Sequence, residues 1–244
     1  MVIATKCCHG PDGKLPDNFE EALSVELAIS LDALRTDYID LLVLHRDNTD
    51  IPVGRIVNRL SAEVAKGSIS GYGVSNWDYN RVDEANDYAH ATGLPGIAVV
   101  SNNLSLAKPT APFYPGLVSV NANGEEWHKR TGVALLSWSS QARGFFAGSY
   151  APELRKNYDS VTDGFLKRMI EVYCTEENFE RLDRANELGA RRGYSAVEVA
   201  LAWAAHKPWV VPVVGPRNVD ELRSCARALE LEISEEESAW LDLK

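Results

Sequence analysis

The chain has few of the features that mark a metalloprotein, a disulfide-stabilised protein or a membrane protein. Its 244 residues contain only four cysteines, and these lack the spacing of a zinc site: Cys7, Cys8, Cys174 and Cys225. No apolar run approaches the ~20 residues that a membrane-spanning helix needs. The N-terminus lacks the succession of basic, apolar and cleavage regions that marks a signal peptide. We therefore expect a protein of the reducing cytoplasm with no membrane span.

Positive charge is also scarce. The sequence has 25 Lys and Arg residues against 35 Asp and Glu residues, which gives a formal net charge of −10 at pH 7. This balance disfavours a nucleic-acid-binding surface or a surface for anionic membranes, although a local basic site is compatible with it. With 45% hydrophobic and 25% charged residues, the chain has the composition of a globular protein with a large core.

What the sequence does contain is a regular alternation of short apolar runs and helical patterns. The apolar runs are typical of parallel strands buried on both faces, and they lie at 2–5, 38–44, 69–74, 97–100, 133–138 and 210–214. Apolar residues recur at helical spacing across 19–34, 52–66, 79–92 and 123–131. The alternation predicts an α/β fold with a parallel sheet.

Residues suited to chemistry follow the first three predicted strands directly. The first strand stops at Lys6, the second at His45, and the third at Ser75 and Asn76. In a barrel of parallel strands, the C-terminal strand ends form the mouth of the active site. We therefore expect these four residues to lie at equivalent ends of three successive strands.

Each of these residues also has a simpler interpretation. Lys6 could be a solvated lysine at a strand end, and a histidine such as His45 is often a hydrogen-bonded core residue. Ser75 and Asn76 are preferred N-cap residues, so they could cap the following helix as well as serve a site. The position at strand ends favours a site role for Lys6 and His45.

Together these features resemble the aldo-keto reductase family, and the resemblance covers essentially the whole chain. Beyond Lys6 and His45, residues 138–144 (Trp-Ser-Ser-Gln-Ala-Arg-Gly) resemble the family's turn after its seventh strand. Residues 209–222 resemble its last strand and the helix that follows, and residues 195–203 resemble its penultimate helix. The resemblance implies a TIM-type (β/α)8 barrel that transfers a hydride between NADP(H) and a small carbonyl or alcohol substrate.

The resemblance also implies roles for individual residues. Lys6 and His45 match the catalytic lysine and the catalytic histidine of the family. The positions that match its cofactor-binding residues are Ser75, Asn76, Ser101, Trp138, Ser139, Gln141, Arg143, Gly215, Arg217, Glu221 and Cys225. Trp138 would stack on the nicotinamide, although it could equally fill the barrel. Arg217 would bind the 2′-phosphate of NADP(H).

The sequence departs from the family's pattern in two ways. The family's general-acid tyrosine and an aspartate precede the lysine strand, where this sequence has no residues to match them. Ser101 stands where a glutamine is common, and Glu221 and Cys225 stand where a glutamine and an asparagine are common. Only six strands are predicted, whereas a closed barrel of this type has eight. We therefore expect one barrel domain over residues 1–244 that lacks its first two βα units.

Several consequences of this interpretation remain open. Residues 143–178 predict a long loop insertion with at most one short helix. An open barrel would expose sheet edges, which favours a homo-oligomer or a partner chain at that edge. Without the tyrosine, we expect the chain alone to be nearly inactive. The alternative function is an incomplete, redox-inactive barrel that serves as a nucleotide-binding or structural subunit.

Overall fold

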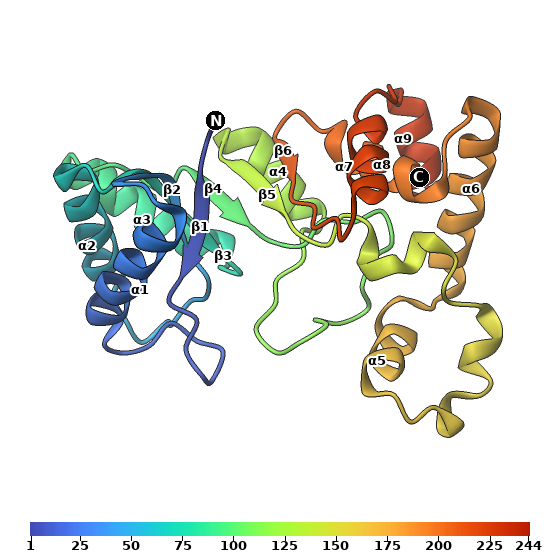
Figure 1. The fold of residues 1–244 in the computed structure, drawn as a ribbon, viewed down its shortest axis with the longest axis horizontal. Helices are drawn as coiled ribbons and strands as arrows, with labels where there is room; N and C mark the ends of the chain where they lie inside the picture. Colours follow the sequence, from blue (N-terminus) through green and yellow to red (C-terminus); the bar gives the residue numbers. More distant parts are fainter. The chain divides into compact units, whose positions relative to one another are not determined.

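The computed structural model describes residues 1–244 and contains six strands that alternate with helices (Figure 1). The strands are β1 (Ala4–Cys7), β2 (Ile39–Leu44), β3 (Ile69–Ser75), β4 (Val99–Ser101), β5 (Ala134–Ser137) and β6 (Val210–Pro212). Their order in the sheet follows their order in the chain, and the pairs from β1 to β5 are parallel. The predicted α/β fold with a parallel sheet is therefore confirmed.

Nine α-helices connect or follow these strands. They are α1 (Phe19–Leu34), α2 (Val53–Lys66), α3 (Tyr79–Thr92), α4 (Ala122–Thr131), α5 (Gly164–Tyr173), α6 (Glu176–Arg192), α7 (Ala196–Ala205), α8 (Val219–Ala228) and α9 (Glu235–Leu241). The helices α2, α3 and α4 each end at a glycine in the left-handed conformation, at Gly67, Gly93 and Gly132. Glycine adopts this conformation without the steric cost of a Cβ, so it terminates a helix readily. None of the helices is long and apolar enough to cross a membrane.

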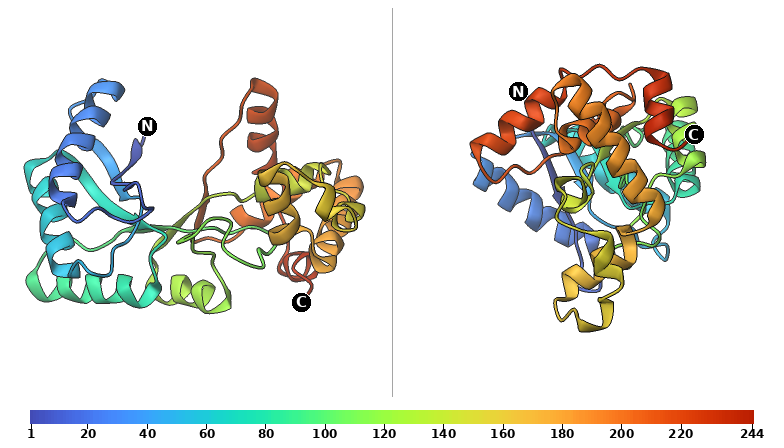
Figure 2. Two further views of the ribbon diagram at one scale, coloured as in Figure 1. Left: turned by 90° about the horizontal axis from the view of Figure 1, so that it is seen from below. Right: turned by 90° about the vertical axis from the view of Figure 1, so that its right-hand side faces the viewer.

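The chain divides into two compact units. The N-terminal unit comprises residues 1–102 and 120–135, and the C-terminal unit comprises residues 103–119 and 136–244. Strands β1–β4 and helices α1–α4 belong to the N-terminal unit, whereas β6 and helices α5–α9 belong to the C-terminal unit. Within the N-terminal unit, α1, α2 and α3 lie on one side of β1–β3 (Figures 1 and 2). The expectation of one barrel domain over residues 1–244 stays a prediction.

The register of the strands in the N-terminal unit aligns their C-terminal ends. The paired residues include Lys6 with Val43, Cys7 with Leu44, Leu44 with Val74, and Ser75 with Ser101. Close approach of β3 and β4 depends on Gly73, because a Cβ there would lie 2.6 Å from the carbonyl oxygen of Val99. The alignment brings Lys6, His45 and Ser75 to the same edge of the sheet, as the sequence predicts.

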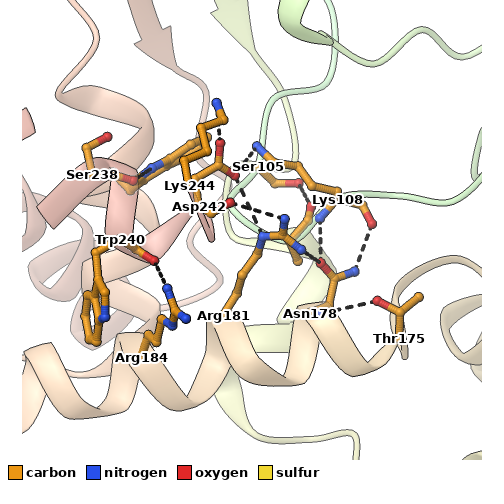
Figure 3. Close-up of polar contacts among 12 residues, drawn as sticks. Ser105, Lys108, Thr175, Asn178, Arg181, Arg184, Ser238, Trp240, Asp242 and Lys244 are labelled. Carbon is orange, nitrogen blue, oxygen red and sulfur yellow. Dashed lines mark hydrogen bonds and ion pairs between the residues drawn. The ribbon is translucent and has the colours of Figure 1, made fainter. Parts of the chain in front are cut away.

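In the C-terminal unit, buried polar contacts tie the loop at 103–119 to α6 and to the end of the chain (Figure 3). The buried side chain of Asn178 accepts a hydrogen bond from the backbone N–H of Lys108 and donates one to its carbonyl, both at 2.8 Å. The Lys108 ammonium pairs with Asp242 at 2.9 Å. Burial alone would raise the pKa of Asp242, but the charges of Lys108 and Lys244 outweigh it and lower that pKa.

The segment 143–178 contains more local structure than a plain loop. Besides α5, it includes the 3₁₀ turns η2 (Pro152–Arg155) and η3 (Tyr158–Ser160), and the turn η1 (Ala142–Ala147) leads into it. Arg143 and Gly144 both have positive φ, at 54° and 87°, so the backbone reverses there. Left-handed backbone at a non-glycine residue is uncommon and must be held by its surroundings.

Candidate active site

The residues predicted to carry chemistry form two groups, one in each unit. In the N-terminal unit, Lys6 at the end of β1 is at the centre. Its ammonium group donates a hydrogen bond to the hydroxyl of Ser101 at 2.9 Å and a longer one to the hydroxyl of Ser75 at 3.5 Å. Lys6 therefore links the ends of β1, β3 and β4, and the structure brings three of the predicted residues into direct contact.

The electrostatics of this group depend on the positive charges around it. Burial among protein atoms, and then the charge of Arg46, lower the pKa of Lys6 to about 8. Burial, followed by the charges of Lys6, His9 and Arg46, lowers the pKa of His45 to about 4. Lys6 is therefore mostly charged at pH 7, whereas His45 is neutral and can donate one hydrogen bond from its ring.

His9 and Arg46 belong to this group although the sequence did not single them out. The rings of His9 and His45 meet edge to face with centroids 4.7 Å apart. Arg46 is only 8% exposed, and its Nε and Nη1 atoms have no hydrogen-bond partner. Arg46 directly follows His45 at the end of β2, so its position was a signal that sequence reasoning could have used.

Ser75 and Asn76 form a tightly bonded turn after β3. The Ser75 hydroxyl donates to the carbonyl oxygen of Ser101 at 2.6 Å, and the Asn76 amide donates to the Ser75 hydroxyl at 3.0 Å. They do not cap the following helix, because the N-cap of α3 is Asp78, whose carboxylate accepts from the N–H of Asn80. The capping interpretation was wrong: the chain runs two residues further before the helix begins.

The second group lines a pocket of about 690 Å³ in the C-terminal unit. The predicted residues at this pocket are Gln141, Arg143, Gly215, Arg217, Glu221 and Cys225. A smaller neighbouring cavity of about 310 Å³ is lined by Ser139 as well as by Gln141, Arg143 and Gly215. Trp138, directly before Ser139, lies with its ring 5.9 Å from the guanidinium of Arg143. The structure thus brings together the predicted residues from the turn after β5 and from the start of α8.

Two arginines dominate the charge of this pocket, and they differ in their surroundings. The guanidinium of Arg143 lies 4.4 Å from the ring centre of Phe113, and its Nε is buried without a hydrogen-bond partner. Arg217 is exposed and forms a forked contact with Glu221, from Nη2 at 2.8 Å and from Nε at 3.1 Å. This contact raises the pKa of Arg217 and lowers that of Glu221.

Cys225 has a minor polar role in the pocket. Its thiol is 4.0 Å from the side-chain nitrogen of Gln141, and burial raises its pKa. A neutral thiol is a weak hydrogen-bond partner, so Cys225 contributes mainly shape.

Each group, taken by itself, has donors that suit one part of a nicotinamide dinucleotide. Ser75, Asn76 and Ser101 offer hydroxyl and amide groups, which can pair with the carboxamide of a nicotinamide. Arg143, Arg217 and the N-terminus of α8 suit phosphate groups. Glu221 is the exception. Its carboxylate pairs with Arg217, the residue that would bind a 2′-phosphate.

Comparison with known proteins identifies the family. The profile of the Aldo/keto reductase family matches residues 1–243. The chain belongs to this family. Among its relatives, norsolorinic acid reductase stcV of Emericella nidulans is 30% identical over 249 residues, which cover 97% of this chain and 58% of that protein. An aryl-alcohol dehydrogenase [NADP(+)] of Phanerodontia chrysosporium is 25% identical, with 99% of this chain and 64% of that protein covered.

A solved structure of this family has the same fold. The thermostable aldo-keto reductase Tm1743, crystallised with the inhibitor epalrestat, matches with a TM-score of 0.67 and 23% identity, covering 92% of this chain and 66% of that one. The likeness confirms the predicted TIM-barrel type, of which this chain carries six strands. The chain spans less than two thirds of the length of the norsolorinic acid reductases that it matches.

Proposed function

We propose that this chain supplies the carbonyl-orienting and cofactor-binding residues of an NADP(H)-dependent oxidoreductase that acts on a small carbonyl or alcohol substrate. The observation that supports this proposal best is the contact of the Lys6 ammonium with the Ser75 and Ser101 hydroxyls, beside a neutral His45. A cation and a neutral ring donor at one strand-end site suit an oxygen on which negative charge develops.

Each side chain of the first group has a definite task in this proposal. A bound nicotinamide dinucleotide would supply the hydride. His45 donates a hydrogen bond to the carbonyl oxygen and fixes its direction. Lys6 places a positive charge near the same oxygen and lowers the pKa of any neighbouring proton donor. Ser75, Asn76 and Ser101 hold the carboxamide of the nicotinamide.

The family resemblance gives the residues of the second group a cofactor-binding role as well. Trp138 and Ser139 border the nicotinamide side, while Gln141, Arg143 and Gly215 face the phosphates. Arg217 binds the 2′-phosphate, provided that it exchanges its contact with Glu221 for the phosphate. A guanidinium fork recognises a phosphate as well as it recognises a carboxylate, so the exchange needs little rearrangement.

The proton donor is the part of this reaction that the N-terminal unit does not offer. The hydroxyls of Tyr72, Tyr79 and Tyr88 contact Pro95, His128 and Asn58, and none of them contacts Lys6. Tyr38 precedes β2 and so belongs to the opposite strand ends. A donor from another chain or from additional sequence would complete the site.

The proposal is tested by cofactor binding and by carbonyl reduction. Quenching of tryptophan fluorescence by NADPH should show saturable binding to the chain. Lys6→Met should abolish whatever NADPH-dependent reduction of an aldehyde panel is measured, while Lys14→Met, an exposed lysine of the same unit, should leave it unchanged. Equal rates for both variants, measured above the background oxidation of NADPH, would refute the role of Lys6.

A redox-inactive, nucleotide-binding or structural subunit is the second candidate, and the name of one relative is that of a subunit. A protein named as a probable voltage-gated potassium channel subunit beta, from Oryza sativa subsp. japonica, is 24% identical over 95% of this chain. This candidate predicts NADPH binding without turnover, also when a proton donor is supplied.

We also propose self-association through the edge of β1, which is the first strand in the order of the sheet. A stable monomer at low concentration in sedimentation would contradict this proposal.

A further inference from the structure

Asn102 directly follows β4 and binds the turn that begins at Ser75 and Asn76. It is not one of the predicted site residues. Its side chain is fully buried. Its Oδ1 accepts a hydrogen bond from the backbone N–H of Asn76 at 2.7 Å, and its Nδ2 donates to the carbonyl of Trp77 at 3.3 Å. One side chain therefore binds the backbone of two successive residues of the turn, Asn76 and Trp77.

These contacts matter because the turn has an unusual backbone. Asn76 has φ of 62°, in the left-handed region that non-glycine residues seldom adopt. This conformation directs the Asn76 amide towards the Ser75 hydroxyl, at 3.0 Å. Such a backbone persists only where the surroundings hold it, and the 2.7 Å bond from the Asn76 N–H to Asn102 holds the backbone of the left-handed residue itself.

Tyr79 and His128 form a hydrogen-bonded pair beside Asn102. The Nδ1 of His128 lies 2.7 Å from the carbonyl of Val133, and because a carbonyl only accepts, this nitrogen must carry the proton. The Nε2 of His128 is then an acceptor for the hydroxyl proton of Tyr79, at 3.4 Å. Burial raises the pKa of Tyr79 to about 12, and the neighbouring Asn102 side chain opposes that rise. The Oδ1 of Asn102 faces Asn76 because the backbone N–H of Asn76 can only donate.

Residues of α4 pack around Tyr79 and His128 and fix their positions. His128 is fully buried, and burial lowers its pKa, so its ring stays neutral and Nε2 remains an acceptor. Gly124 leaves room for the ring of Tyr79, since a Cβ there would lie 2.6 Å from a ring carbon. The ring of Trp127 packs on Tyr79 with centroids 4.8 Å apart.

We propose that Asn102 is a positioning residue, which sets the Ser75–Asn76 turn in the shape that binds the nicotinamide. The proposal rests on the proposed function, because it assigns these two residues to the nicotinamide end of the cofactor. It predicts that Asn102 affects that end alone, through Asn76, and has no effect on the phosphate end.

The test compares two probes that differ only in the nicotinamide. Both NADPH and 2′-phospho-ADP-ribose are titrated against the full chain and against Asn102→Ala. We expect the dissociation constant for NADPH to rise about tenfold, the size of effect that follows from a lost buried hydrogen bond. The constant for 2′-phospho-ADP-ribose should stay within about twofold, as an unperturbed subsite would give.

Two further variants separate positioning from a general loss of structure. Tyr79→Phe keeps the ring and removes only the hydroxyl, so it should weaken NADPH binding less than Asn102→Ala does, again without effect on the fragment. Asn48→Ala removes another buried asparagine of the N-terminal unit, whose amide donates to the carbonyl of Leu15 at 3.0 Å. It should cost comparable thermal stability and leave both dissociation constants unchanged.

Each outcome has a distinct meaning. If Asn102→Ala weakens NADPH and the fragment equally, or weakens neither, the positioning role is wrong while the proposed function stands. If Asn102→Ala does not fold, Tyr79→Phe decides in the same way. If the unmodified chain binds neither probe, both the proposed function and the positioning role are overturned.

Discussion

The two groups of site residues differ in how firmly the fold holds them. In the N-terminal unit, Ser75, Ser101 and Asn102 are fully buried and bonded within a connected network. In the C-terminal unit, the side chain of Arg217 is 86% exposed and contacts only Glu221, on the same short stretch of chain. Buried bonds fix side chains to within fractions of an ångström, whereas an exposed ion pair can exchange its partner.

The difference matches the proposed tasks of the two groups. A group that directs a reacting carbonyl must be placed accurately, because small misplacements cost large factors in rate. A group that binds a phosphate by charge tolerates more movement, since Coulomb attraction varies slowly with distance. We therefore expect substitutions in the N-terminal unit to affect geometry and rate, and those in the C-terminal unit to affect affinity.

The largest expected effect concerns turnover by residues 1–244 alone. Lys6 and His45 can orient a carbonyl, but no phenol of the N-terminal unit contacts them, so proton transfer lacks its donor. We expect NADPH oxidation with aldehydes to be at least ~10²-fold below the usual enzymatic range of about 1–10³ s⁻¹. The absorbance of NADPH measures it. Turnover within that range would show that another residue donates the proton, and Tyr150 and Tyr158 would be the first to replace.

The next effect tests the phosphate role of Arg217. Arg217→Ala should weaken NADPH binding by roughly 10- to 100-fold, because it removes a charge-assisted contact to the phosphate. Isothermal titration measures it. Arg223→Ala is the control. It removes an exposed arginine of α8, which pairs with Asp220 at 3.1 Å, and it should leave the affinity unchanged. An unchanged affinity for Arg217→Ala would move the 2′-phosphate elsewhere.

A smaller effect should come from Glu221. Glu221→Gln removes a negative charge beside the proposed phosphate site and frees Arg217. Like charges a few ångströms apart repel only weakly in water, so NADPH binding should tighten by roughly fivefold. Binding of NADH, which lacks the phosphate, should not change. If the variant instead weakens NADPH binding, then Glu221 supports the cofactor rather than opposing its phosphate.

The smallest effect concerns the pH dependence of stability. The pKa of His45 in the fold is about 4, below its ordinary value of 6.5, so the unfolded chain binds more protons between these pH values. Stability should therefore fall as the pH drops from 6.5 towards 4. Between pH 6.5 and pH 4, the free energy of unfolding should fall by on the order of 1 kcal/mol less in His45→Gln than in the unmodified chain. The difference is modest because the His45 side chain is only half-buried.

Chemical denaturation at several pH values measures this change. His90→Gln, at the exposed end of α3, is the matched control and should leave the pH dependence as it is. A profile for His45→Gln that parallels the unmodified chain would show that His45 is accessible to protons, and the N-terminal group would then be less rigid than the comparison states.

Much of the fold and part of the site could be predicted from local sequence. All six strands were predicted, and the helix at 79–92 has the predicted bounds. Lys6, His45 and Ser75 were placed correctly at one edge, because parallel strands connected by helices must bring their C-terminal ends together. The resemblance then brought the six pocket residues of the C-terminal unit into one group, and the structure places them around one pocket.

What the sequence determined by itself is the order of strands and helices and the residues at the strand ends, because periodicity and chain direction are local properties. Only the tertiary structure decided which side chains meet across strands. Asn102 was not recognised because its partner Asn76 is 26 positions away. The capping role of Asp78 and the pairing of Arg217 with Glu221 likewise depended on backbone angles and side-chain directions. These hydrogen bonds depend on distances between side chains in the folded protein. They could therefore be identified only once the strand register and the backbone angles were known.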